Sequence, residues 1–151
     1  AFSTASSAAT LPTTLKCVQD NAGIKKDYAT FVLPLGATVN MDGTAIYESI
    51  AIIFLIQTLG EPFAHNLEFA NQVVIFISVT LAAIGAAGIP GAGIFMLLMM
   101  MTVQGVPLAL IGLVLVLDRP LDMVRTCVNV WGDAIGCTVV SNSEEKALSK
   151  V

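Results

Sequence analysis

The chain has 151 residues, of which 56% are hydrophobic and only 12% are charged, and its mean hydropathy is +0.83. Soluble domains usually carry about 25% charged residues, so this composition predicts a membrane protein or a piece of one. The net charge of -4 is too small to indicate a strongly charged partner, and the lack of a basic stripe argues against nucleic-acid binding. No pairing of a nucleophile with a base is visible, so we do not expect an enzyme.

The first part of the chain is rich in small residues and then becomes polar. Residues 1–12 contain several Ser, Thr and Ala and run into a predicted helix, and small residues let helices and ligands approach closely. The chain opens without a Met or a basic leader. We therefore expect it to be the C-terminal part of a longer protein.

Two polar loops differ in charge and so predict an orientation. The loop at 16–30 carries three Lys residues, whereas the loop at 60–71 has Glu61 and Glu68 but no Lys or Arg. Because Lys and Arg are enriched in cytoplasmic loops, we expect the first loop to be cytoplasmic and the second external. The lone His65 lies in the second loop, and we assign it no role.

The hydrophobic run at 31–57 is long enough to cross a bilayer, which takes about 20 apolar residues. Its middle nevertheless holds Asn40, Asp42, Gly43 and Thr44, which favour non-helical backbone. An ionisable residue at membrane depth indicates a functional site. We predict a broken helix that offers carbonyl and carboxylate oxygens to a cation. The alternative is a kinked helix in which Asp42 caps the second half.

The run at 72–103 is too long for one simple crossing. Its centre, I-G-A-A-G-I-P-G-A-G at 84–93, cannot form a continuous helix, and each flanking half is too short to span the hydrocarbon core. We predict a re-entrant hairpin whose tip lies within protein or beside a cavity. A phosphate-binding loop is the alternative, and it fits poorly because no Lys follows the glycines.

The last hydrophobic run, 107–140, carries a narrow polar stripe. Asp118, Asp122, Arg125, Asn129 and Asp133 follow one another at steps of three or four residues, which places them on one helix face. The stripe lacks the Lys and Glu that crowd exposed faces, so we expect it to be buried; the alternative is a face open to solvent. The tail at 141–151 is expected to be cytoplasmic and frayed.

Four motifs in this order resemble those of the sodium-coupled glutamate/aspartate transporters, the dicarboxylate/amino acid:cation symporter family. They are S-S-A-A-T-L-P at 6–12, L-P-L-G-A-T-V-N-M-D-G-T-A at 33–45, A-G-I-P-G-A-G at 87–93 and D-M-V-R-T-C-V-N-V-W-G-D at 122–133. The motifs are distributed over nearly the whole chain, which makes the resemblance specific.

The resemblance implies an all-α membrane protein, multi-pass in the cell membrane, with re-entrant hairpins and interrupted helices. This chain would be the C-terminal part of the transport domain, and the N-terminal scaffold, which forms a homotrimer, would be missing. The implied segments are the second half of a first re-entrant hairpin at 1–19, a broken transmembrane helix at 28–58, a second hairpin at 71–104, an amphipathic last transmembrane helix at 106–140 and the cytoplasmic tail at 141–151.

The resemblance also implies residue roles, with Asp122 holding the substrate ammonium and Arg125 its side-chain carboxylate. The implied substrate-binding residues are Ser6, Ser7, Thr44, Ile89, Pro90, Gly93, Asp122, Arg125, Thr126 and Asn129. The implied ligands of co-transported sodium ions are Gly36, Thr38, Asn40, Met41, Asp42, Ala83, Ile84, Ala86, Asn129 and Asp133. Glu48 resembles the proton-carrying glutamate of the family, which implies that protons are transported together with the sodium ions.

The leading hypothesis is therefore sodium-coupled symport of acidic amino acids across the membrane. Within the same family, a carrier of neutral amino acids would not need Arg125, and a carrier of C4-dicarboxylates would not need Asp122. A non-transporting truncated fragment and an ion-channel pore are the alternatives from other classes.

Overall fold

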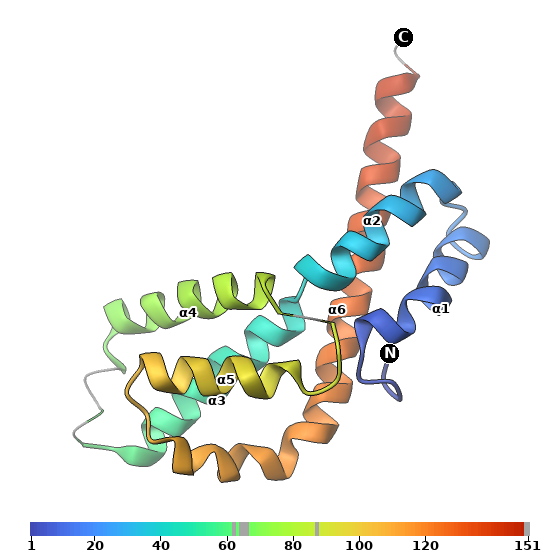
Figure 1. Ribbon diagram of the computed structural model, residues 1–151. Coiled ribbons are helices and arrows are strands. Elements are labelled where there is room, and N and C mark those ends of the chain that lie inside the picture. The colour runs from blue at the N-terminus through green and yellow to red at the C-terminus, as the bar shows by residue number, and fades with distance from the viewer. Residues whose placement is uncertain (62, 64–66, 87, 150–151) are drawn as a thin grey trace.

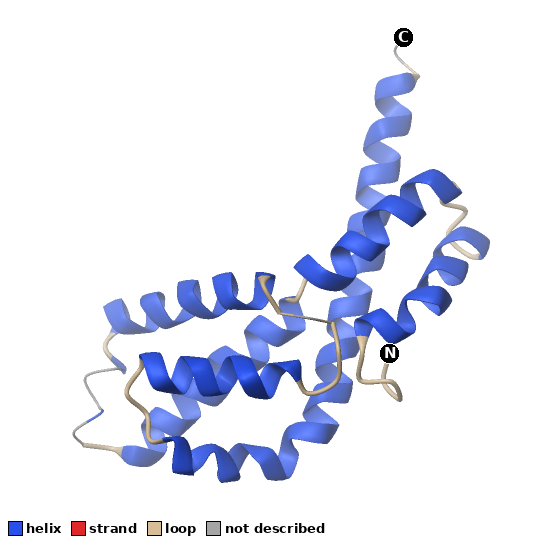
Figure 2. Cartoon of the chain, viewed as in Figure 1, coloured by secondary structure: helices blue, strands red, loops and turns tan. Residues whose placement is uncertain are grey.

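A computed structural model of the chain describes residues 1–61, 63, 67–86 and 88–149. Within these residues the chain forms helices and no strand, which confirms the all-α class (Figure 2). His65 and the last two residues of the tail lie outside the described residues. The helices are α1 (Ser7–Asp20), α2 (Lys26–Val39), α3 (Asp42–Leu59), α4 (Phe69–Ile84), α5 (Ala92–Val103), the 3-10 helix η2 (Leu108–Leu110) and α6 (Ile111–Leu148).

The chain leaves the helical conformation between α2 and α3. Asn40 has φ -91° and ψ 81°, and Met41 has φ -109° and ψ 50°, so the break falls at the polar residues in the middle of the apolar run. Of the described residues, the stretch Lys26–Leu59 is the one helical region long and apolar enough to cross a membrane. This stretch therefore combines the length of a membrane span with an interruption near its middle.

Helices α4 and α5 form an antiparallel pair that packs on α3 (Figure 1). Their 16 and 12 residues correspond to about 24 and 18 Å at 1.5 Å per residue. The shared core contains Leu55 and Ile56 of α3, Ile75 of α4, and Leu97 and Met101 of α5, all nearly fully buried. This apolar core fixes the pair against α3 and so places the α4–α5 connection beside the break.

Helix α6 is longer than predicted, which corrects the expectation of a frayed tail. It has 38 residues and continues past the expected end at residue 140 through most of the tail that we expected to be frayed. The tail residues Glu144 to Leu148 are good helix formers. Lys25 Nζ lies 3.1 Å from Glu145 Oε1, and this hydrogen bond raises the pKa of Lys25.

The first part of α6 bends before the helix continues toward the C-terminus (Figure 1). Pro120 lies inside this part and has no N–H to donate to the carbonyl of Val116. Sharp bends in helices usually have such a cause. Beyond the proline, the polar face of α6 runs past both α2 and α3.

Candidate functional site

Four parts of the chain meet at one small pocket, whose cavity volume is about 10 Å³. They are the start of α1, the α2–α3 break, the α4–α5 connection and the middle of α6. The lining residues are Ala5, Ser6, Ser7, Met41, Thr44, Ala86, Gly88, Ile89, Ala92, Gly93, Asp122, Arg125, Thr126 and Asn129. Of the predicted substrate-binding residues, only Pro90 is not among them.

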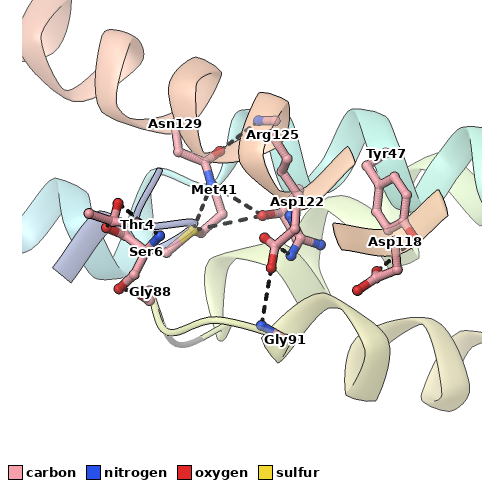
Figure 3. Close-up of polar contacts among 12 residues, drawn as sticks. Thr4, Ser6, Met41, Tyr47, Gly88, Gly91, Asp118, Asp122, Arg125 and Asn129 are labelled. Carbon is pink, nitrogen blue, oxygen red and sulfur yellow. Dashed lines mark hydrogen bonds and ion pairs between the residues drawn. The ribbon is translucent and has the colours of Figure 1, made fainter. Parts of the chain in front are cut away.

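Asp122 and Arg125 both line the pocket, and their side chains lie against each other (Figure 3). Their side chains are only 2% and 5% exposed, and Arg125 Nη2 donates to Asp122 Oδ1. The other carboxylate oxygen, Oδ2, accepts the backbone N–H of Gly91 at 3.2 Å. Both oxygens of Asp122 thus have donors, one from α6 itself and one from the α4–α5 connection.

The Arg125 guanidinium group has hydrogen-bond donors that its contact with Asp122 does not use. Its Nη1 is buried and has no hydrogen-bond partner among the described residues. Gly93 makes room for it, because a Cβ atom at position 93 would overlap Nη1. On its other side the guanidinium lies over the Tyr47 ring, with Cζ 5.1 Å from the ring centroid. Since buried polar groups normally have partners, this Nη1 is suited to receive an anionic ligand.

Asn129 ties α6 to the beginning of α3. Its Oδ1 accepts the backbone N–H of Gly43 at 2.8 Å, and its Nδ2 donates to Met41 Sδ and Thr44 Oγ1, both at 3.3 Å. These contacts satisfy an N–H in the first turn of α3, which has no partner within the helix. The side chain also links the pocket to the residues of the helix break.

The start of α1 contacts the α4–α5 connection. Ser6 Oγ donates to the Gly88 carbonyl at 2.7 Å, and the backbone N–H of Ala8 donates to the same oxygen at 3.1 Å. Ser6 Oγ also accepts the N–H of Ala9 at 3.1 Å and so caps α1. These contacts place the serine motif and the glycine-rich motif next to each other in the lining of one pocket.

A second cluster of polar side chains lies at the end of α2, next to the pocket. Asn40 Nδ2 donates to Asp133 Oδ1 at 3.0 Å, and Gly36 faces the same carboxylate, because a Cβ at position 36 would lie 2.6 Å from Asp133 Oδ1. Asp133 is 5% exposed, whereas Asp42 is exposed. The described residues contain no cluster of three His, Cys, Asp or Glu that could hold a metal ion, so a cation here would need carbonyl oxygens as well.

The remaining predicted ion ligands divide into two sets. Met41, Ala83 and Ala86 are buried together in one small cluster. Thr38 is exposed and its hydroxyl donates to the Leu35 carbonyl at 2.9 Å, and Ile84 is 48% exposed. The structure thus brings the first three together, while the side chains of Thr38 and Ile84 lie at the surface.

Glu48 lies in α3, fully buried at 0% exposure. Neither of its carboxyl oxygens has a hydrogen-bond partner among the described residues, although the charge of Arg125 acts on it. A buried acid without partners is costly, so Glu48 is not expected to stabilise the fold.

Sequence reasoning missed Tyr47 and Asp118 as neighbours of the site. Tyr47 Oη donates to Asp118 Oδ1 at 3.1 Å, beside the guanidinium group of Arg125 (Figure 3). The signal for Asp118 was present, because it lies four residues before Asp122 on the same stripe. The sequence signal for Tyr47 is weaker and consists only of its position, one helical turn after Thr44.

Comparisons with known proteins match almost the whole chain. The model of the sodium:dicarboxylate symporter family matches residues 1–143. The chain is 45% identical over 151 residues to excitatory amino acid transporter 2 of Mus musculus, covering 100% of this chain and 26% of that protein. It is 45% identical over 140 residues to an excitatory amino acid transporter of Caenorhabditis elegans, covering 93% and 27%. It is also 45% identical over 142 residues to excitatory amino acid transporter 1 of Rattus norvegicus, covering 94% and 25%. The chain thus spans about a quarter of the length of these curated relatives.

Proposed function

The chain belongs to the sodium:dicarboxylate symporter family, and from this premise we propose that the protein containing it is a multi-pass transporter of the cell membrane that couples sodium entry to uptake of acidic amino acids. Membership confirms the resemblance found in the sequence and agrees with the expectation that the protein is not an enzyme. The names of the relatives support an amino acid as the substrate.

One observation carries the choice of substrate: Nη1 of Arg125 has no hydrogen-bond partner among the described residues, and it lies in a pocket that also holds Asp122. An acidic amino acid has one ammonium and two carboxylate groups. Asp122 receives the ammonium, and the planar guanidinium of Arg125 pairs with the side-chain carboxylate. Ser6, Ser7 and Asn129 face the main-chain carboxylate, and the α4–α5 connection closes over the substrate.

Sodium ions are the coupled cargo in this proposal. Asp133 supplies the carboxylate charge, and the carbonyls of Gly36, Asn40 and Asn129 complete one oxygen shell, as a hard cation requires. Met41 and Thr38, with the carbonyls of Ala83, Ile84 and Ala86, form a second sodium site. Asp42 with Asn40 forms a third, and Glu48 carries a proton.

The architecture proposed for the full protein follows the resemblance. Helices α4 and α5 form a re-entrant hairpin, α1 is the second half of another, and the N-terminal scaffold holds three copies together as a homotrimer. The shortness of α4 and α5 supports the assignment of the re-entrant hairpin.

The test is uptake by the full-length protein in proteoliposomes with an inward sodium gradient. Arg125→Cys is expected to abolish uptake of aspartate and glutamate while small neutral amino acids continue to bind, because the guanidinium pairs only with the side-chain carboxylate. Asp122→Asn is expected to lose both substrate classes, since both carry the ammonium. Wild-type aspartate affinity in Arg125→Cys would show that Arg125 is only the ion-pair partner of Asp122, and the acidic-substrate proposal would be wrong.

A further inference from the structure

Gly132 of α6 lies opposite the two polar side chains that leave the helix break. A Cβ atom at position 132 would be 2.7 Å from Asn40 Nδ2 and 3.0 Å from Asp42 Oδ2. Real Cβ atoms are almost never found as close to another heavy atom as the first of these distances. The absence of a side chain on Gly132 therefore allows Asn40 and Asp42 to lie against α6 together.

The atoms that a methyl group would displace belong to the ends of side chains, not to the backbone. This distinguishes Gly132 from Gly43, where a Cβ would collide with the backbone carbonyl oxygen of Arg125. Helix interiors favour alanine over glycine, so the fold itself gives no reason for glycine at position 132. The change would instead move the Asn40 amide, which donates to Asp133 Oδ1 at 3.0 Å.

We propose that Gly132 is a positioning residue for sodium: by leaving space beside α6, it holds Asn40 and Asp42 in the arrangement in which Asn40 stays hydrogen-bonded to Asp133. This inference rests on the sodium-coupled function proposed above. Gly132 touches no ion itself. It acts through Asn40, which joins the break between α2 and α3 to the carboxylate on α6.

Gly136 provides the matched control. It lies one turn further along α6 and is partly buried like Gly132, yet a Cβ at position 136 would meet no atom of the described residues within 4 Å. Gly132→Ala and Gly136→Ala therefore add the same methyl group to the same helix, and only the first displaces the ion-binding side chains.

The experiment uses the full-length protein and two readouts. The first is the sodium concentration that gives half-maximal aspartate uptake in proteoliposomes. The second is the rise in Tm of the detergent-solubilised protein when sodium chloride replaces choline chloride, which reports cation binding without transport. Gly132→Ala is expected to raise the half-maximal sodium concentration about 10- to 100-fold, as changes that misplace metal ligands do, and to reduce the sodium-induced rise in Tm. Gly136→Ala is expected to match the wild type in both.

A double-mutant cycle tests the route through Asn40. In an Asn40→Ala background, Gly132→Ala is expected to cause little further loss of sodium affinity. Full additivity, or unchanged sodium dependence in Gly132→Ala, would overturn the proposal. So would a loss of Tm in choline chloride as large as that of Gly43→Ala, because the methyl group would then disturb the fold. If the wild type and Gly136→Ala both lack sodium-dependent uptake, the proposed function itself is wrong.

Discussion

Replacement of Glu48 by methionine tests whether this buried acid lowers stability in exchange for a function. The side chain is 0% exposed, and neither oxygen has a hydrogen-bond partner among the described residues. A partnerless buried polar group costs about 1–3 kcal/mol. Methionine has a similar length, is flexible enough to fill an irregular gap and carries no oxygen, so Glu48→Met removes this cost.

The expected gain can be bounded. Two partnerless oxygens correspond to about 2–6 kcal/mol if their costs add. Apolar repacking removes up to about 1.5 kcal/mol of this, and loss of the attraction from Arg125 lowers it further. We therefore expect Glu48→Met to raise the free energy of unfolding by about 1–2 kcal/mol, close to the low end of these estimates.

The measurement is the Tm of the purified full-length protein, with Ile52→Met as the control. Ile52 is also 0% exposed and lies one turn after Glu48 on α3. Glu48→Met is expected to raise Tm by a few degrees, whereas Ile52→Met lowers it slightly. In transport assays, Glu48→Met and Glu48→Gln should both lose the pH dependence of net uptake. A Tm lower in Glu48→Met than in Ile52→Met would show that the carboxyl group has partners, and the reasoning would be refuted.

Two further predictions concern orientation and the surroundings of the site. Cysteines placed at Lys25 and Glu61 and probed with an impermeant reagent on whole cells should label only at position 61; labelling at position 25 alone would reverse the topology. Tyr47→Phe removes the hydroxyl that donates to Asp118 Oδ1 at 3.1 Å but keeps the ring beside Arg125. It should lower stability by about 1.5–3 kcal/mol and leave substrate choice unchanged, whereas an altered ratio of acidic to neutral uptake would contradict this.

The parts of the fold that the sequence predicts well are those determined by neighbouring residues. Asn40, Asp42 and Gly43 weaken a helix locally, and the chain leaves the helical conformation at Asn40 and Met41. The polar stripe on α6 needs only the helical period, and Asp122 and Asp133 are both buried as expected. The helical tail was mispredicted because its charged residues suit both a helix and a solvated end.

Contacts between residues distant in sequence could not be predicted in this way. Tyr47 and Asp118 are 71 positions apart, and their contact depends on how α3 lies against α6. The space beside Gly132 likewise exists only because the helix break approaches α6 at that point. A glycine in a helix shows from sequence alone that a side chain is missing, but not which atoms occupy the space.

In the proposed mechanism, the hydrogen bonds of Asp122 connect substrate binding to the closure of the pocket. Its carboxylate already accepts from Arg125 Nη2 and from the Gly91 N–H, so a substrate ammonium must compete with donors that the chain itself supplies. One of these donors belongs to the α4–α5 connection, whose Gly88 carbonyl is also bound by Ser6. In the proposed mechanism, an ammonium that takes Oδ2 releases Gly91, and a carboxylate that binds Arg125 weakens its pair with Asp122. Because the first of these exchanges breaks a contact between the connection and α6, the occupancy of Asp122 and the position of the connection depend on each other.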